Sequence, residues 1–157
     1  MQIRGVKKYL DGGQESVYCD IMHRDNSSLA LRYLHTEDPY AAAVEVVEMY
    51  FWENRDYVLY KLFTIHGTPR GYRFEVCRDL KLADDRAERM DLGLSLTVDP
   101  IGDLHIEGEE IVVEYEGRGL LEASDKEIIQ RARESIAENY RVVLREAEDL
   151  RSRSRGR

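Results

Sequence analysis

The chain has 157 residues, which is the length of one domain, and 43% of them are hydrophobic, which is enough to bury a core. Charged residues make up 34%, so we expect a densely ionic surface. The formal net charge of −8 argues against a protein that binds nucleic acid over its whole surface, and it suits a protein whose acidic groups hold a divalent cation.

Short strands are predicted over the first half of the chain. Alternating apolar and polar residues, bounded by turn residues, predict strands at Ile3–Tyr9, Val17–His23, Leu29–Leu34, Val44–Trp52, Tyr57–Ile65 and Tyr72–Cys77. The turn at 66–71 joins the last two as a hairpin, and residues 36–39 break the pattern. Many short strands at this spacing predict a mainly β protein, an antiparallel β-barrel or sandwich.

The strand predicted at Met90–Val98 carries the most informative pattern in the chain. Leucine recurs at 92, 94 and 96, so Asp91, Gly93 and Ser95 share the opposite face. A face with one carboxylate and two small residues can approach a metal ion or a phosphate, and it can equally be an ordinary solvated face.

The C-terminal part of the chain changes to a helical period. Ser124 and Glu127 have the spacing of a capping box, which marks a helix start. Apolar or aromatic residues then recur at Ile129, Ala132, Ile136, Tyr140, Val143, Ala147 and Leu150. This spacing predicts one long amphipathic helix over 125–150, whose stripe packs on the barrel or on a second copy in a homodimer. Residues 1–150 then form one domain, and the arginine-rich residues 151–157 form a disordered tail.

Two further features bear on where the protein works. Cys19 and Cys77 each lie alone in a strand-like segment, which favours buried reduced thiols over a disulfide and argues against a thiolate zinc site. The first residues lack the apolar core of a signal peptide, and no apolar run reaches transmembrane length. We therefore expect a cytoplasmic protein without a membrane partner.

Acidic residues are the main candidates for a chemical site. They are Glu75, Asp91, Asp99, Asp103, Glu107, Glu109 and Glu110. Neighbouring strands of a barrel can bring Glu75 and Asp91 near the acids at 107–110, and oxygen ligands of this kind suit Mg²⁺ or Mn²⁺. The alternative is that these acids are solvated surface groups.

Other residue groups are less specific. The aromatic residues between 50 and 63 can stack on a nucleobase or form part of the core. Aromatic residues at strand spacing are more often part of the core. The histidines show no metal-ligand spacing, and residues 117–119 are predicted to be a loop before the long helix. The arginine tail can contact RNA phosphates or act as a solubilising end.

Several segments together resemble a known family. They are Tyr50–Val58, Gly71–Val76, Met90–Ser95, Pro100–Gly102 and Glu107–Glu110, in the order and at the spacing of that family. It is a β-barrel domain family that was once listed as of unknown function. Its members include nucleoside di- and triphosphate phosphatases, the cytidylyl-phosphonate hydrolase of fosfomycin biosynthesis, and the C-terminal domain of ribonuclease-G-like proteins with affinity for AU-rich RNA.

The resemblance implies an antiparallel barrel with C-terminal helices and a site that this chain has altered. The family pattern reads Tyr-Cys-Asn-Ile, then Asp-Leu-Asp-Leu-Asp, then Asp-Glu-Asp-Glu. Here Tyr72 and Asp91 are retained, Glu75 stands where the family has an amide, and Gly93 and Ser95 replace two aspartates. The loss of two carboxylates from one strand face weakens the binding of a divalent ion.

The leading hypothesis is a phosphohydrolase that depends on Mg²⁺ or Mn²⁺ and acts on nucleoside di- or triphosphates or a related phosphate ester. The predicted metal ligands are Glu75, Asp91, Glu107 and Glu110. The predicted catalytic residues are Asp91 and Tyr72, and the predicted substrate-binding residues are Arg55, Tyr57 and Arg73. The alternatives are an RNA-binding or RNA-processing module and a non-catalytic relative that has lost its metal site.

Overall fold

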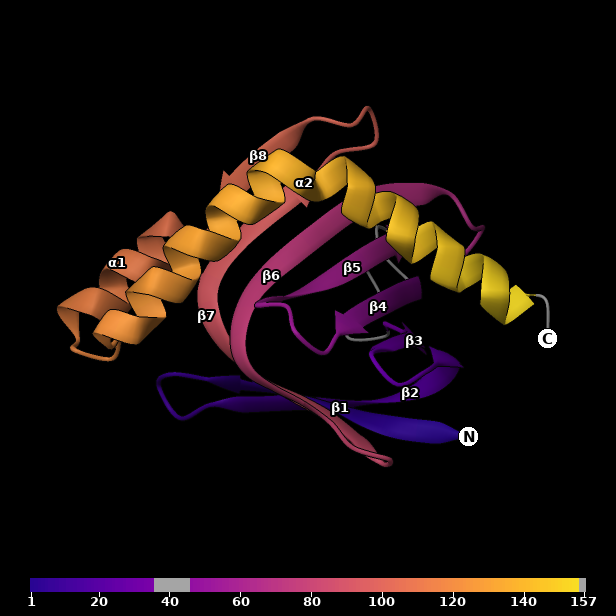
Figure 1. Cartoon of the computed structure of the whole chain (residues 1–157), viewed down its shortest axis with the longest axis horizontal. Coiled ribbons are helices and arrows are strands. Elements are labelled where there is room, and N and C mark those ends of the chain that lie inside the picture. The colour runs from indigo at the N-terminus through magenta and orange to yellow at the C-terminus, as the bar shows by residue number, and fades with distance from the viewer. Residues whose placement is uncertain (36–45, 156–157) are drawn as a thin grey trace.

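The computed structural model describes residues 1–35 and 46–155, which form eight strands and two helices (Figure 1). The strands are β1 (Gln2–Tyr9), β2 (Gln14–Arg24), β3 (Ser28–Leu34), β4 (Val46–Trp52), β5 (Tyr57–Phe63), β6 (Pro69–Leu82), β7 (Arg86–Val98) and β8 (Leu104–Glu107). The helices are α1 (Glu109–Gly117) and α2 (Ala123–Arg155). The predicted break at 36–39 and the predicted strand start at Val44 lie outside the described residues.

The strands form a closed barrel. Consecutive strands pair antiparallel from β1 to β8, and the β5–β6 hairpin predicted from the sequence is present. A parallel pairing between β1 and β7 joins the two ends of the sheet, so seven strands form the barrel and β8 extends it outside β7. The prediction of a mainly β barrel with a long C-terminal helix is therefore confirmed, with one parallel pair at the closure.

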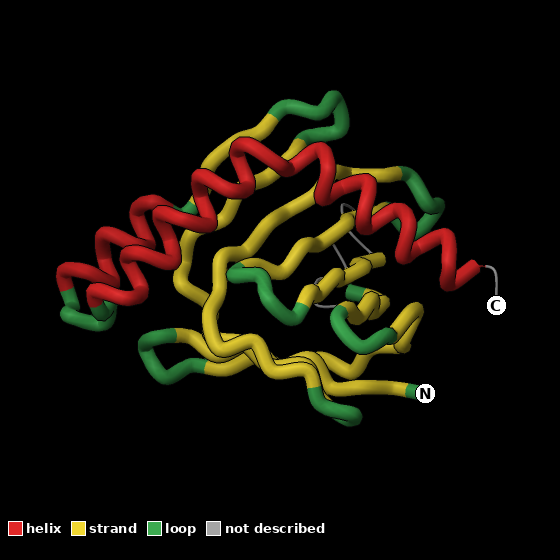
Figure 2. Tube along the Cα trace, in the orientation of Figure 1, coloured by secondary structure: helices red, strands yellow, loops and turns green. Residues whose placement is uncertain are grey.

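Both faces of β4 are covered. In β4, Met49 and Phe51 face the barrel interior, whereas Tyr50 and Trp52 lie on the outer face beneath α2. Figure 2 shows the helices along one side of the strands. Because one strand face fills the barrel and the other meets a helix, all seven residues of β4 are buried, and the aromatic residues there are core.

The apolar stripe of α2 packs on this chain's own barrel. Ile129, Ala132, Ile136, Val143 and Leu150 belong to the same buried cluster as the outer-face residues of the sheet. Of the two partners predicted for the stripe, the barrel is the one observed. Since the stripe is already buried, it does not offer the surface that the predicted homodimer requires.

The limits of α2 differ from those predicted. It begins at Ala123, and the capping acid is Asp125 rather than Glu127, because the Asp125 carboxylate accepts a hydrogen bond from the backbone N–H of Glu122 at 3.0 Å. At the other end the helix continues to Arg155, so the tail predicted to be disordered is helical over 151–155. Arg151 stabilises this extension, since its Nε lies 3.0 Å from the carboxylate of the buried Glu48.

The short helix α1 was not predicted from the sequence. It follows Gly108, whose φ of 83° is left-handed, and no side chain caps its first turn. It packs on β7, and the segment predicted as a loop at 117–119 begins where α1 ends. Cys19 and Cys77 are free and buried, as predicted. None of the helices in the described residues is both long and apolar enough to span a membrane.

Candidate functional site

A cavity of about 340 Å³ lies in the barrel interior. All seven barrel strands contribute to its lining, and its charged residues include Lys7 from β1, Arg73 and Glu75 from β6, and Arg89 from β7. Tyr60 from β5 also lines it. The cavity is therefore a place where residues far apart in the sequence meet around one space.

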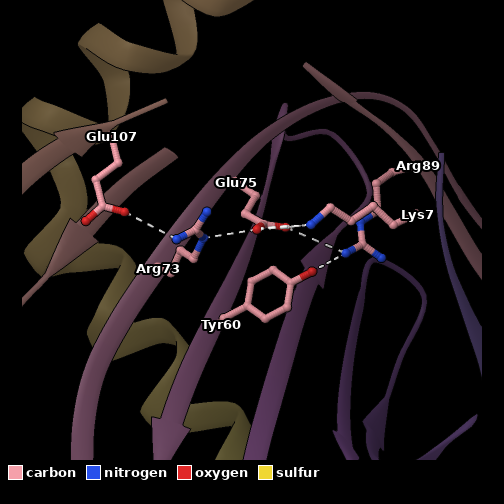
Figure 3. A network of polar contacts seen from close by, with 6 residues as sticks. All are labelled: Lys7, Tyr60, Arg73, Glu75, Arg89 and Glu107. Carbon is pink, nitrogen blue, oxygen red and sulfur yellow. Dashed lines mark hydrogen bonds and ion pairs between the residues drawn. The ribbon is translucent and has the colours of Figure 1, made fainter. Parts of the chain in front are cut away.

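Glu75 is the centre of an ionic network in this cavity (Figure 3). Its Oε1 lies 2.9 Å from Lys7 Nζ, and its Oε2 accepts a hydrogen bond from Arg73 Nε at 3.0 Å. Arg89 lies 3.9 Å from the same carboxylate and donates a hydrogen bond to the hydroxyl of Tyr60. A single buried carboxylate thus has three basic side chains around it.

The strand period places these groups inside the barrel. Ile3, Gly5 and Lys7 alternate along β1 with residues of the other face, and Lys7 pairs in register with Arg89 of β7. Tyr60 pairs with Arg73, so these two side chains share the interior face of the sheet. Lys7 and Arg89 did not stand out in the sequence, because a lone cation in a strand resembles a solvated residue. The period of two along β1 puts Lys7 on the same face as the apolar Ile3, and this is the signal that could have placed Lys7 inside the barrel.

The electrostatics of the cavity favour an anion. Burial alone would raise the pKa of Glu75, but Lys7, Arg89 and Arg73 outweigh burial and lower it, so the carboxylate is ionised. Three basic side chains, Lys7, Arg73 and Arg89, face two carboxylates in the lining, Glu75 and the exposed Glu15, within a chain of net charge −8. Arginine and lysine side chains arranged in this way suit a phosphate group.

Asp91, predicted as both a catalytic residue and a metal ligand, is buried beside this network. It pairs in register with Cys77 of β6 and with Tyr9 of β1, and only 9% of it is exposed. Burial, followed by the charge of Glu75, raises the pKa of Asp91 to about 6. Its neighbourhood therefore disfavours the ionised form that a metal ligand requires.

The other positions of the predicted strand face are closed. Gly93 has a φ of 95°, and a Cβ atom there would lie 2.9 Å from Ile111 Cγ2 and 3.2 Å from Tyr115 Cε2 of α1. Ser95 is buried at 4% exposure and pairs in register with Glu75 and Glu107. The face that was expected to approach a metal ion or a phosphate is thus covered by α1 at Gly93.

The predicted metal ligands do not form a ligand set. Arg73 lies between Glu75 and Glu107, with Nη1 3.3 Å from Glu107 Oε2. Glu110 is exposed in the first turn of α1. Across residues 1–35 and 46–155, no three His, Cys, Asp or Glu side chains are grouped as metal ligands. These donors do not fit a divalent ion in this arrangement, and binding of Mg²⁺ or Mn²⁺ stays a prediction.

The predicted substrate-binding residues are divided between two places. Arg73 lies in the barrel cavity, but Arg55 and Tyr57 line a separate groove of about 390 Å³ beside α2. There Arg55 lies over the Trp52 ring at 4.4 Å and 2.6 Å from Glu146. It is thus held by residues of its own chain.

Tyr72, the second predicted catalytic residue, is also outside the cavity. Its hydroxyl donates a hydrogen bond to Glu148 Oε1 of α2 at 3.0 Å. Lys61 forms an ion pair with the same carboxylate. Tyr72 therefore lies on the outer face, where it helps to fasten α2 to the sheet.

Comparison with known proteins identifies the fold. No model of a protein family matches the chain, and no curated protein sequence matches it. Six chains of solved structures do, among them a phosphatase and FomD. The phosphatase SC4828 with the non-hydrolysable nucleotide GPCP superposes with a TM-score of 0.77 at 14% identity, over 90% of this chain and 82% of that one. FomD with CDP superposes with a TM-score of 0.73 at 12% identity, over 88% and 83%. The chain shares their fold.

Proposed function

We propose that the protein is a phosphohydrolase that binds a nucleoside di- or triphosphate, or a related phosphate ester, in the barrel cavity. The observation that carries the proposal is the group of three cations, Lys7, Arg73 and Arg89, around one interior space. Support comes from the two proteins of the same fold, one a phosphatase with a bound nucleotide analogue and the other a complex with CDP.

The chemistry proposed for the cavity is electrostatic. The guanidinium groups of Arg73 and Arg89 and the ammonium group of Lys7 bind phosphate oxygens and offset the charge that develops on them. Phosphoryl transfer passes through a loose transition state in most accounts, so positioning and charge provide most of the rate enhancement. Glu75, whose pKa is lowered by its cations, orients these cations rather than acting as a strong base.

The proposal is tested by binding and turnover in parallel. Phosphate release from ADP, GDP, CDP and their triphosphates is measured with and without Mn²⁺, and binding of a non-hydrolysable analogue is measured by calorimetry. We expect Arg73→Gln and Arg89→Gln to reduce both the phosphate release and the binding of the analogue. The matched control is Arg131→Gln, whose side chain is exposed and pairs with Asp56 away from the cavity. Failure of every nucleotide to bind would overturn the proposal.

A non-catalytic nucleotide-binding relative is the second candidate. It is favoured by the closed position at Gly93 and by the buried Ser95, where the resembling family has aspartates. This candidate predicts that nucleotides bind in the cavity without phosphate release, with or without Mn²⁺. RNA binding through the arginine tail stays a prediction, and Arg151 of that tail is already paired with Glu48.

A further inference from the structure

We infer that Lys7, Arg73 and Arg89 replace a divalent cation in this barrel, so that the cavity binds phosphate ligands without Mg²⁺ or Mn²⁺. The inference rests on the proposed function, because it concerns how the same cavity holds the same class of ligand. The positive charge that a bound metal ion would supply is then part of the chain itself.

The first support is the position of Arg73. Its guanidinium group lies between Glu75 and Glu107, at 3.0 Å and 3.3 Å, and so it bridges two of the carboxylates predicted to share a metal ion (Figure 3). A metal ion bound to Glu75 would also meet Lys7 Nζ, which is 2.9 Å from the same carboxylate. Like charges at such short range repel strongly, the more so in a partly buried site.

The second support is the position of α1. A metal site on β7 would need carboxylates on the interior face of that strand, but the Cβ direction of Gly93 is filled by Ile111 and Tyr115. The helix therefore occupies the space in which further oxygen ligands would stand. The chain has cations where a metal would lie and apolar side chains where its ligands would lie.

The third support is that Arg73 remains open to a ligand. Its side chain is 38% exposed, and its Nε and Nη1 account for the two carboxylate contacts found among the described residues. A guanidinium group has five N–H donors, so further donors can reach a phosphate oxygen. The contact with Glu107 is an exposed ion pair, with Glu107 53% exposed, and such a pair is easily exchanged for a phosphate.

The test compares one probe in two buffers. Inorganic pyrophosphate and the analogue GPCP are titrated into the full chain by calorimetry, once in excess EDTA and once with millimolar Mn²⁺. We expect the dissociation constants in the two buffers to agree within about threefold. Arg73→Gln should weaken binding about tenfold to a hundredfold in both, since a charge-assisted contact is lost. Arg131→Gln is the control.

Glu107→Gln separates the two roles of that carboxylate. If Glu107 competes with the ligand for Arg73, its neutralisation tightens binding in EDTA, whereas if it holds a metal ion, its neutralisation weakens binding in Mn²⁺. Because Glu107 is exposed, this variant does not depend on a rearranged core. Binding that requires Mn²⁺ would overturn the inference and leave the proposed function standing, and no binding in either buffer would overturn the proposed function itself.

Discussion

Asp91 and Glu75 are buried near one another, and yet their surroundings move their pKa values in opposite directions. Glu75 has Lys7 and Arg73 within 3.0 Å, so its pKa is lowered although burial would raise it. Asp91 is dominated by burial and by the charge of Glu75, and its pKa rises to about 6. The two carboxyl groups thus differ in the direction of their pKa shift, because Lys7 and Arg73 form ion pairs with Glu75.

The raised pKa of Asp91 predicts a pH-dependent stability. Protonated Asp91 contributes stability that is fully present below its unfolded pKa of 3.8 and is lost as pH rises through about 6. Asp91→Asn mimics the protonated form, so its free energy of unfolding relative to wild type should rise by about 2 kcal/mol between pH 4 and 7. Urea unfolding over a pH series measures this, with exposed Asp84→Asn as the control. A constant difference would contradict the prediction.

Gly93 provides a second prediction at the scale of one residue. Gly93→Ala meets both a left-handed backbone and the side chain of Ile111, whereas Gly12→Ala meets the same kind of backbone, with a φ of 98°, in open space. Both variants lose about 1–2 kcal/mol to backbone strain. Gly93→Ala should lose about 1–3 kcal/mol more through overpacking, as measured by urea unfolding. Equal losses would show that α1 does not press on this position.

At the scale of the element, α2 is fastened to the barrel at both ends by buried acids. Near its start, Asp125 is fully buried and lies 3.2 Å from Arg78 of β6. Near its end, Glu48 of β4 is 1% exposed and is bound by Arg151 and by the hydroxyl of Tyr50. The helix position is therefore fixed by charge as well as by its apolar stripe.

The N-terminal fastening predicts which acid caps the helix. Asp125→Ala removes both the hydrogen bond to the Glu122 backbone and the partner of Arg78, so we expect a loss of about 2–4 kcal/mol in the free energy of unfolding. Glu127→Ala, at the exposed position that the sequence favoured, is the matched control and should change stability by less than about 0.5 kcal/mol. If thermal or urea unfolding shows a larger loss of stability for Glu127→Ala than for Asp125→Ala, then Glu127 caps the helix, as the sequence predicted.

The ion pair near the C-terminal end of α2 predicts how much the helix extension contributes to the free energy of unfolding. Arg151→Gln leaves buried Glu48 without its guanidinium partner, and we expect a loss of about 1–3 kcal/mol in the free energy of unfolding. The control is Arg153→Gln, an exposed arginine in the same turn region. If both variants unfold at the same urea concentration, the ion pair is not what holds the end of α2.

Periodicity alone predicted the elements with long or regular patterns. The leucines of β7 and the stripe from Ile129 to Leu150 needed no tertiary information, because each repeats with the period of its element. The helix α1 was missed because its nine residues carry only a weak apolar pattern and its start at Gly108 has no capping side chain. Its contact with Gly93 arises only when β7 has folded.

The candidate site was less predictable than the fold. The acids were predicted as metal ligands, but the cavity is defined by Lys7, Arg73 and Arg89, of which only Arg73 was predicted. Lys7 comes from β1, at the start of the chain, whereas Arg73 and Arg89 come from β6 and β7. Only closure of the barrel through β1 and β7 brings Lys7 beside Arg89. Tyr72 illustrates the same limit, since its place in β6 was predicted and the face on which it lies was not.

At the scale of the whole molecule, barrel and helix share one buried cluster. Leu92, Leu94 and Leu96 of β7 pack with Ile136 and Val143 of α2, so neither part can expose its apolar face alone without a large loss of burial. This arrangement indicates that α2 is part of the core and not an appendage.

The shared cluster predicts cooperative unfolding. Backbone amides of α2 near Ile136 and amides of β6 near Phe74 should exchange with the same free energy of opening, equal to that of global unfolding. Hydrogen exchange over a denaturant series measures both. The control is the end of α2 near Arg155, where the helix frays and the backbone amides should exchange with a low free energy of opening. Earlier opening of the whole of α2 would contradict a single cooperative unit.

The parallel pairing of β1 with β7 also imposes an order on assembly. β1 can pair with β2 as soon as the first turn forms, but its second edge meets its partner only after residues 86–91 are available. Until then the growing sheet presents an unpaired edge, which is a template for association with other chains. Lys7 and Lys8 lie on that edge, and lysines on an edge strand oppose edge-to-edge association. Lys7, which lines the cavity in the folded barrel, therefore also opposes association with other chains before the barrel closes.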